Sequence, residues 1–296
     1  MALERGWREW VARWVGREDL AQAPVSVVAA AGRADQSASE ATPWMATPLH
    51  LAAGLTTLHF DVRGILRLPP EELDELSLDF HRSFQDSTLV PLASGEFLLH
   101  LAGVPPARTT EPARIAGGNV ADALPQGAGA ASLRRLGAEI EMWLHEHSVN
   151  RARVRRGELP VSTLWIWGGG ATFAPMASAR GDTLPRALGS DSYLRGLWQL
   201  CGGEARSLPD ELDPPYAESA VLVVEAGQML RTKATWSMPE LLGEVDRRFI
   251  AKAVSALERR DIQRVSILAN DRCLVLGVGG SRKFWRRARP ALEGLQ

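Results

Sequence analysis

The chain contains 296 residues, of which 45% are hydrophobic and 23% charged, and its formal net charge is −1. These proportions are typical of a packed globular protein with room for one large domain or two ordinary ones, and the near-neutral charge argues against binding to nucleic acid or an anionic membrane through overall charge. Two cysteines, Cys201 and Cys273, match no metal-ligand spacing and give no sign of a disulfide scaffold, so we expect both to be buried free thiols.

The first predicted element is an amphipathic helix near the N-terminus. Trp7, Trp10 and Trp14 fall on one face of a helix over 7–15, so they either pack on their own domain or contact a protein partner or a membrane surface. The best apolar run here, Val25–Ala31, is far too short to span a bilayer, so we expect no transmembrane segment and a cytoplasmic location. The segment Gly32–Thr42, rich in small and polar residues, predicts a surface loop or linker.

The next portion, from Trp44 to about Ala130, predicts an α+β unit. Pro69 and the residues Pro70-Glu71-Glu72 open a helix that continues through Phe84. Alternating or apolar runs predict three short strands, at Leu55–Asp61, Leu89–Leu92 and Glu96–Leu101.

The C-terminal portion alternates predicted helices and strands. Ser132 is the expected N-cap of a long helix that ends near Gly157, and a strand ending in three glycines follows, as if to begin a parallel βαβ unit. The elements expected in this portion are helices at Ser132–Arg156, Ser192–Cys201 and Pro239–Arg260 and strands at Val161–Trp167, Ala220–Glu225 and Val265–Leu268. The chain is therefore predicted to be an α/β protein with a doubly wound mixed or parallel sheet and an N-terminal α+β portion.

This pattern divides the chain into three portions. Residues 1–43 hold the tryptophan helix and linker, residues 44–131 the α+β portion, and residues 132–296 the α/β portion. The last two are compatible with one compact domain.

The most distinctive segment runs from His145 to Gly170 and reads HEHSVNRARVRRGELPVSTLWIWGGG. It resembles archaeal-type, cofactor-independent phosphoglycerate mutases, in which a helix ending His-Pro-Val-Asn leads through an Arg-and-Gly turn into a strand ending Trp-Gly-x-Gly; Ser148 replaces their proline. The chain also resembles bacterial mutase-like proteins of the RpfE type, through Thr47–His50 and the helix element Glu139–Glu146. The resemblance implies an alkaline phosphatase-like fold, whose enzymes use two divalent metal ions and a serine nucleophile.

The metal ligands that the resemblance requires do not match this sequence. Where those enzymes have Asp-x-x-x-His, this chain has Glu225-Ala-Gly-Gln228-Met, and where they have Asp-His it has Asp271 followed by Arg272. Nothing before Trp44 reads as their Asp-Gly metal-binding strand or as the start of the serine site. We therefore expect no dimetal site and no cofactor.

Several residues are candidates for ligand binding. A phosphate-containing small molecule is the expected ligand, because glycine N–H groups at the end of a strand and arginine side chains both suit a phosphate. The alternatives are purely structural roles. Asn150 would then cap backbone groups, the glycines would form a tight turn, and the cations would form a solvated face. The candidates are Asn150, Arg151, Arg153, Gly168, Gly169, Gly170, Arg282 and Arg286.

Three functions are open from the sequence. The first is a non-catalytic regulatory or binding protein on a degenerate mutase-like fold. The second is a phosphoglycerate mutase or phosphatase-like enzyme with an atypical site, for which His50, Asp191 and Asp271 are the catalytic candidates. The third is a nucleic-acid-associated module acting through the basic segment Arg282–Arg289, which the near-neutral charge disfavours.

Overall fold

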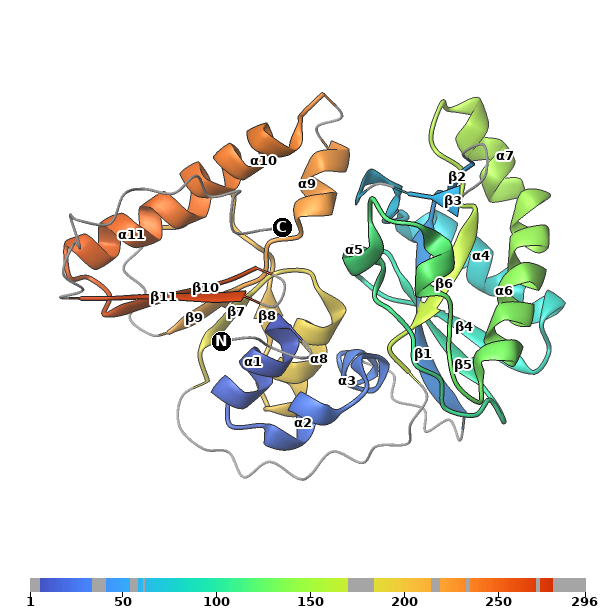
Figure 1. The fold of residues 1–296 in the computed structure, drawn as a ribbon, viewed down its shortest axis with the longest axis horizontal. Coiled ribbons are helices and arrows are strands. Elements are labelled where there is room, and N and C mark those ends of the chain that lie inside the picture. Colours follow the sequence, from blue (N-terminus) through green and yellow to red (C-terminus); the bar gives the residue numbers. More distant parts are fainter. Residues whose placement is uncertain are drawn as a thin grey trace.

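The elements gather around two separate sheets (Figure 1). The structure is a computed structural model, and it describes residues 6–33, 41–53, 58–60, 62–169, 184–213, 219–232, 235–269 and 272–278. One group of helices packs on a four-stranded antiparallel sheet, and a second group packs on a three-stranded parallel sheet. The mixed α/β class predicted from the sequence is confirmed.

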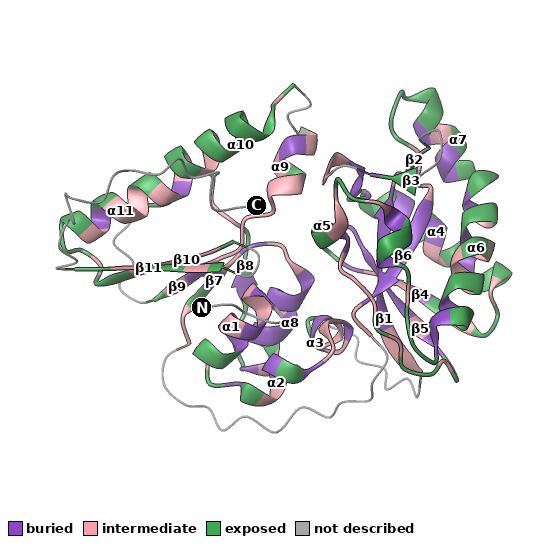
Figure 2. Ribbon diagram, viewed as in Figure 1, coloured by how far each residue is buried: buried purple, intermediate pink, exposed green. Residues whose placement is uncertain are grey.

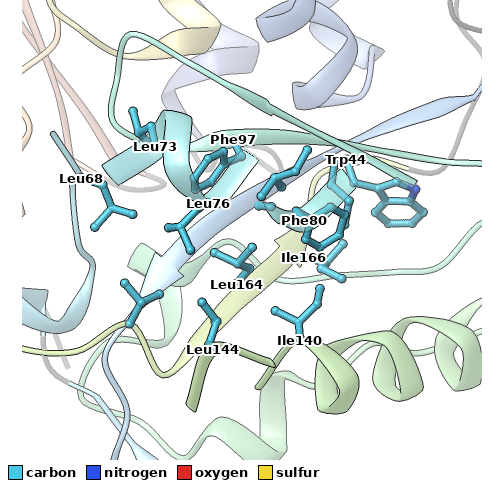
Figure 3. Close-up of a cluster of buried hydrophobic side chains, with 14 of the residues drawn as sticks. Trp44, Leu68, Leu73, Leu76, Phe80, Phe97, Ile140, Leu144, Leu164 and Ile166 are labelled. Atoms are coloured by element: carbon cyan, nitrogen blue, oxygen red, sulfur yellow. The ribbon is translucent and has the colours of Figure 1, made fainter. Parts of the chain in front are cut away.

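The four-stranded sheet has the order β4-β5-β1-β6, and every neighbouring pair is antiparallel. Its strands are β1 (Thr42–Leu49), β4 (Ser87–Pro91), β5 (Phe97–Leu101) and β6 (Thr163–Trp167). The helices that accompany it are α4 (Pro70–Ser83), α6 (Ala130–His145) and α7 (Ser148–Arg155). In Figure 3, Leu76 and Phe80 of α4 and Ile140 and Leu144 of α6 meet Ile166 of the sheet in one apolar cluster, which is the core of this half.

The three-stranded sheet has the order β8-β7-β9 and is parallel throughout. Its strands are β7 (Arg186–Leu188), β8 (Ala205–Arg206) and β9 (Ala220–Leu222). The helices α1 (Trp7–Trp14), α2 (Glu18–Gln22) and α8 (Ser192–Leu200) share a second core with it. Figure 2 shows α8 almost wholly buried, whereas α10 is largely exposed and α11 consists mainly of half-buried and exposed residues.

Helix α3 (Val25–Ala31) links the two groups, because it packs against both α8 and β1. The approach is so close that a Cβ on Gly196 would lie 1.7 Å from the carbonyl oxygen of Val28, and one on Gly32 would lie 2.9 Å from the amide nitrogen of Gly196. Only glycine fits at these two positions, so the crossing of α3 and α8 depends on them.

The remaining elements are short or lie along the C-terminal part. A continuous helical run comprises α10 (Met238–Val245), a π-helical stretch (Asp246–Ile250) and α11 (Ala251–Glu258), followed by the hairpin of β10 (Arg264–Ala269) and β11 (Arg272–Gly277). The others are β2 (Ala52–Ala53), β3 (Leu58–His59), η1 (Val62–Gly64), α5 (Pro112–Ile115), η2 (Val120–Ala123) and α9 (Ala226–Thr232).

Several sequence predictions are confirmed. The N-terminal helix, the helix opened by Pro70, the helix from Ser192 and the strands ending at Leu101 and Trp167 all form. Among the described residues, none of the helices combines the length and apolarity that a bilayer crossing requires. Both cysteines are free thiols, but only Cys201 is buried, and Cys273 is half-buried.

The predicted single helix Ser132–Arg156 is wrong, because the chain forms α6 and α7 with a break between them. His147 has extended backbone angles and N-caps α7, its Nδ1 accepting from the amide of Val149. Ser132 is not the N-cap of α6; Gly129 is.

The strand placement also differs from the prediction. β6 pairs antiparallel with β1, so it does not begin a parallel βαβ unit. β1 was not predicted, since Pro43 and Pro48 argue against a central strand, yet it is paired on both sides. Of the strand expected at Leu55–Asp61, the described residues form only Leu58–His59, and the loop expected at Gly32–Thr42 falls largely outside them.

Candidate functional site

Three polar residues follow the carboxyl ends of two parallel strands. Ser190 and Asp191 come directly after β7, and Glu225 comes after β9. Because the carboxyl edge of a parallel sheet is where open α/β folds bind ligands, these residues define the candidate site. The Ser190 hydroxyl donates to Oε1 of Glu225 at 2.9 Å, which joins the two strand ends.

Arg67 lies between two carboxylates at this edge. Its Nη2 donates to Oε2 of Glu225 at 2.8 Å, and its Nη1 lies 2.7 Å from Oε1 of Glu96. The three side chains are only 19%, 14% and 8% exposed respectively. Although burial raises the pKa of Glu96, the charge of Arg67 and the hydrogen bonds that the carboxylate accepts together outweigh it, so the pKa lies below its usual range. Glu96 is therefore held as a carboxylate by a fixed cation.

Hydroxyl groups complete the surroundings of Glu96. Thr47 donates to Oε1 at 2.7 Å and Ser94 to Oε2 at 3.2 Å. The Thr47 hydroxyl accepts in turn from Nε1 of Trp167 at 2.9 Å, and Ser94 accepts from Ser192 at 2.7 Å. These bonds connect the four-stranded sheet to the start of α8, so the network spans both halves of the molecule.

Asp191 is bound by an arginine from the N-terminal helix. Nη2 of Arg8 lies 3.3 Å from Asp191, and its Nη1 donates to Glu111 at 2.8 Å. The carboxylate of Asp191 also accepts from the amide of Leu194 at 3.0 Å and so caps α8. Burial raises the pKa of Asp191 above its usual range, against the opposing charge of Arg8.

Aromatic rings surround the Arg8 guanidinium. It lies 4.8 Å from the ring centroid of Trp7, 5.5 Å from that of Trp167 and 5.9 Å from that of Tyr193, distances within cation–π range. Trp7 also meets Tyr193 edge to face. This side of the predicted tryptophan helix thus packs on its own chain.

The other two tryptophans of that helix stack on each other with centroids 5.7 Å apart. Trp10 packs against the core of the parallel sheet, whereas Trp14 is 41% exposed. Of the partner surface expected at Trp7, Trp10 and Trp14, the indole of Trp14 is the part that solvent reaches most.

The arrangement does not suit a metal ion. Within the described part of the chain, no group of three or more His, Cys, Asp and Glu side chains is placed to hold one. The carboxylates of Glu96, Glu225 and Asp191 are instead bound by Arg67 and Arg8. The cluster therefore holds carboxylates of two kinds, because the pKa of Glu96 is lowered beside Arg67 whereas burial raises the pKa of Asp191.

The predicted ligand residue Asn150 is occupied by backbone groups. Its Nδ2 donates to the carbonyls of Leu144 and Val161, and its Oδ1 accepts from the amide of Val161, all at 2.7–2.8 Å. These bonds join the end of α6 to the approach to β6, so the residue is engaged in the fold.

The neighbouring arginines line a different region. Arg151 is exposed, while Arg153 is buried and pairs with Glu72. With Arg156, Arg153 lines a surface pocket of about 490 Å³ that reaches Arg67. Within this pocket Arg153 and Arg156 are paired with Glu72 and Glu158, so their charges are already compensated.

The glycines after β6 are used in packing. The amide of Gly168 donates to Thr109 at 3.0 Å, and a Cβ on Gly169 would lie 2.4 Å from the carbonyl oxygen of Pro43. Gly168 has a φ of +65°, so the chain turns sharply there. The amide of Gly168 is therefore already bonded where a phosphate was expected.

The other predicted residues are apart from the cluster or outside the description. Nδ1 of His50 lies 2.9 Å from the carbonyl oxygen of Pro160, away from the acids described above. Gly170, Asp271, Arg282 and Arg286 lie outside the described residues.

Sequence reasoning missed Arg8, Arg67 and Glu96. Arg67 and Glu96 form no motif with neighbours, and their ionic partners lie at least 29 positions away. The one available signal was Glu225, the single carboxylate at the end of the predicted strand Ala220–Glu225.

Comparison with known proteins finds a distant likeness to a solved structure. No family model and no curated protein matches the chain. Among solved structures, it is similar to the cofactor-independent phosphoglycerate mutase from Thermoplasma acidophilum DSM 1728, with 14% sequence identity and a TM-score of 0.36. The match covers 77% of this chain and 66% of that enzyme, so the chain spans just under two thirds of its length.

Proposed function

We propose that the chain is a regulatory or ligand-binding protein, not a catalyst, on a degenerate mutase-like fold related to RpfE-type proteins, and that it acts in the cytoplasm. The observation that carries the proposal is the pairing of Arg67 with both Glu96 and Glu225 at the carboxyl edge of the parallel sheet. The division into portions 1–43, 44–131 and 132–296 belongs to the same proposal.

The physical reason is charge compensation. Two divalent cations need several anionic or imidazole ligands free to bind them. Here the guanidinium of Arg67 already neutralises the carboxylates and donates to Glu225, so a metal ion would first have to expel a buried arginine. A site of this kind keeps its shape without metal.

The test is metal uptake together with turnover. The purified full-length chain is incubated with manganese, dialysed and analysed for bound metal, then assayed for phosphoglycerate mutase and phosphatase activity beside a metal-dependent mutase as positive control. We expect well under one metal ion per chain and no turnover. Stoichiometric metal with turnover would overturn the proposal in favour of an enzyme, in which Asp191 and His50 would be the first residues to replace.

A further inference from the structure

Arg231, near the end of α9, differs from Arg67 and Arg8 because it forms no ion pair with the described residues. Its Nη1 is buried and has no hydrogen-bond partner among the described residues. Arg67 and Arg8, by contrast, each bind carboxylates at two points. A buried guanidinium without a partner is costly, so this one lacks an anion that its surroundings do not supply.

The neighbouring carboxylates are not available to pair with Arg231. Glu225 and Glu96 lie near enough to influence Arg231, but their oxygens already bind Arg67 and the hydroxyls of Ser190 and Thr47. Burial lowers the pKa of Arg231 to about 10, and the like charge of Arg67 adds to the effect. The charge on Arg231 is therefore held at a cost in the protein alone.

The guanidinium has a defined place at the junction of α9 and η1. Its Nη1 lies 3.5 Å from the point where a Cβ on Gly227 would stand, and Cγ2 of Val62 lies 3.0 Å from the same point. The absence of a side chain at Gly227 leaves room for the guanidinium to lie along its own helix. Nη1 is buried, whereas Arg231 as a whole is only half-buried, so part of the side chain is exposed to solvent.

We propose that Arg231 binds a small oxyanion, a phosphate or carboxylate group, at the junction of α9 and η1. The planar guanidinium presents parallel N–H donors that match two oxygens of such a group. The proposal deepens the proposed function, on which it rests, by naming the class of ligand that the non-catalytic site takes.

The test compares unfolding midpoints of the full-length chain in sodium phosphate, sodium acetate and sodium chloride at equal ionic strength. We expect phosphate to raise the midpoint by about 2–4 °C at ten times its Kd, relative to chloride. The acetate arm separates the two sources: a shift with acetate as well shows that a carboxylate suffices, and a shift with phosphate alone identifies a phosphoryl group.

Arg231→Gln should abolish the shift, and Arg231→Lys, which keeps the charge but loses the planar fork, should weaken binding about tenfold. Arg195→Gln is the matched control, because Nε of Arg195 is also buried without a partner but Arg195 is not among the charges that perturb Arg231. This control should respond to phosphate like the wild type.

Without anion, Arg231→Gln should unfold at the same or a higher temperature than the wild type, since it removes an uncompensated charge. A shift retained in Arg231→Gln, an equal response of the wild type to all three salts, or failure of Arg231→Gln to fold would each overturn the anion site. If neither phosphate nor acetate shifts the unfolding midpoint, and the chain takes up no metal and shows no turnover, only the anion site is rejected. Metal uptake with turnover rejects the proposed function itself.

Discussion

Nη2 of Arg67 donates to Oε2 of Glu225 at 2.8 Å across 158 positions of sequence. Arg67 enters the cluster from the segment between η1 and α4, and Glu225 follows the last strand of the parallel sheet. Because Arg67 also pairs with Glu96, it ties one sheet to the other through ionic contacts that water barely reaches.

Arg67→Met should lower the free energy of unfolding by about 3–5 kcal/mol, because it leaves two buried carboxylates without their cation. Urea unfolding followed by tryptophan fluorescence measures this loss. The matched control is Arg82→Met, which removes an exposed pair with Asp79 and should change stability by less than about 0.5 kcal/mol. Equal effects of the two substitutions would show that Arg67 contributes no more than a surface charge.

Thr47→Val should cost about 2–3 kcal/mol, because the buried hydroxyl both donates to Glu96 and accepts from Trp167. Thr47→Ser keeps both bonds and loses only a methyl group, at about 1 kcal/mol. Both are measured by urea unfolding at neutral pH. The same loss in both variants would mean that the methyl group, and not the hydrogen bonds, accounts for the effect.

His147 should make stability depend on pH. Nδ1 of His147 accepts from the amide of Val149, which requires the neutral ring. Burial lowers the pKa of His147 below the ordinary value of 6.5, and the charge of Arg151 lowers it further. The negative charges of Asp79 and Glu75 oppose this shift. A lowered pKa in the folded state gives a contribution that is present above about pH 6.5 and is lost as the pH falls through the folded pKa.

His147→Asn, which can cap α7 without titrating, should flatten the stability profile below about pH 6.5. Urea unfolding at half-unit pH steps measures the slope for both proteins. Identical slopes would assign the acid sensitivity to other groups.

Gly169→Ala should lower stability by more than about 2 kcal/mol, because its Cβ would lie 2.4 Å from the carbonyl oxygen of Pro43 and 2.7 Å from the ring of Trp44. Gly137→Ala in α6 is the matched control, since nothing lies within 4 Å of its Cβ position. That substitution should stabilise the chain by about 0.5–1 kcal/mol through helix propensity. Differential scanning calorimetry distinguishes the opposite signs, and two changes of the same sign would contradict the contact at Gly169.

Local signals predicted the elements that local interactions build. Pro70 opens α4 at its first position, and the helix from Ser192 is capped by Asp191 within three residues, so nearby residues determine where each helix begins. β1 depends on partners at Phe97–Leu101 and Thr163–Trp167 that override its two prolines. No local pattern contains that information.

The candidate site was less predictable for the same reason. Glu225 was visible as an acid after a strand, but nothing near it indicates that Arg67 neutralises it. The sequence left open whether Asn150 binds a ligand or caps backbone groups. The position of Val161 decides this, because the side-chain amide of Asn150 bonds to the backbone of Val161. Residue type indicated polar chemistry, while long-range packing determined which groups meet.

The crossing of α3 and α8 has a consequence for biosynthesis. Val28 contacts Gly196, which is synthesised about 168 residues later. At ordinary elongation rates this delay between the synthesis of the two residues is roughly 10–30 s. During that time the apolar face of α3 has no partner from α8, so nascent chains stalled before residue 192 are the forms most exposed to chaperones and to mispairing.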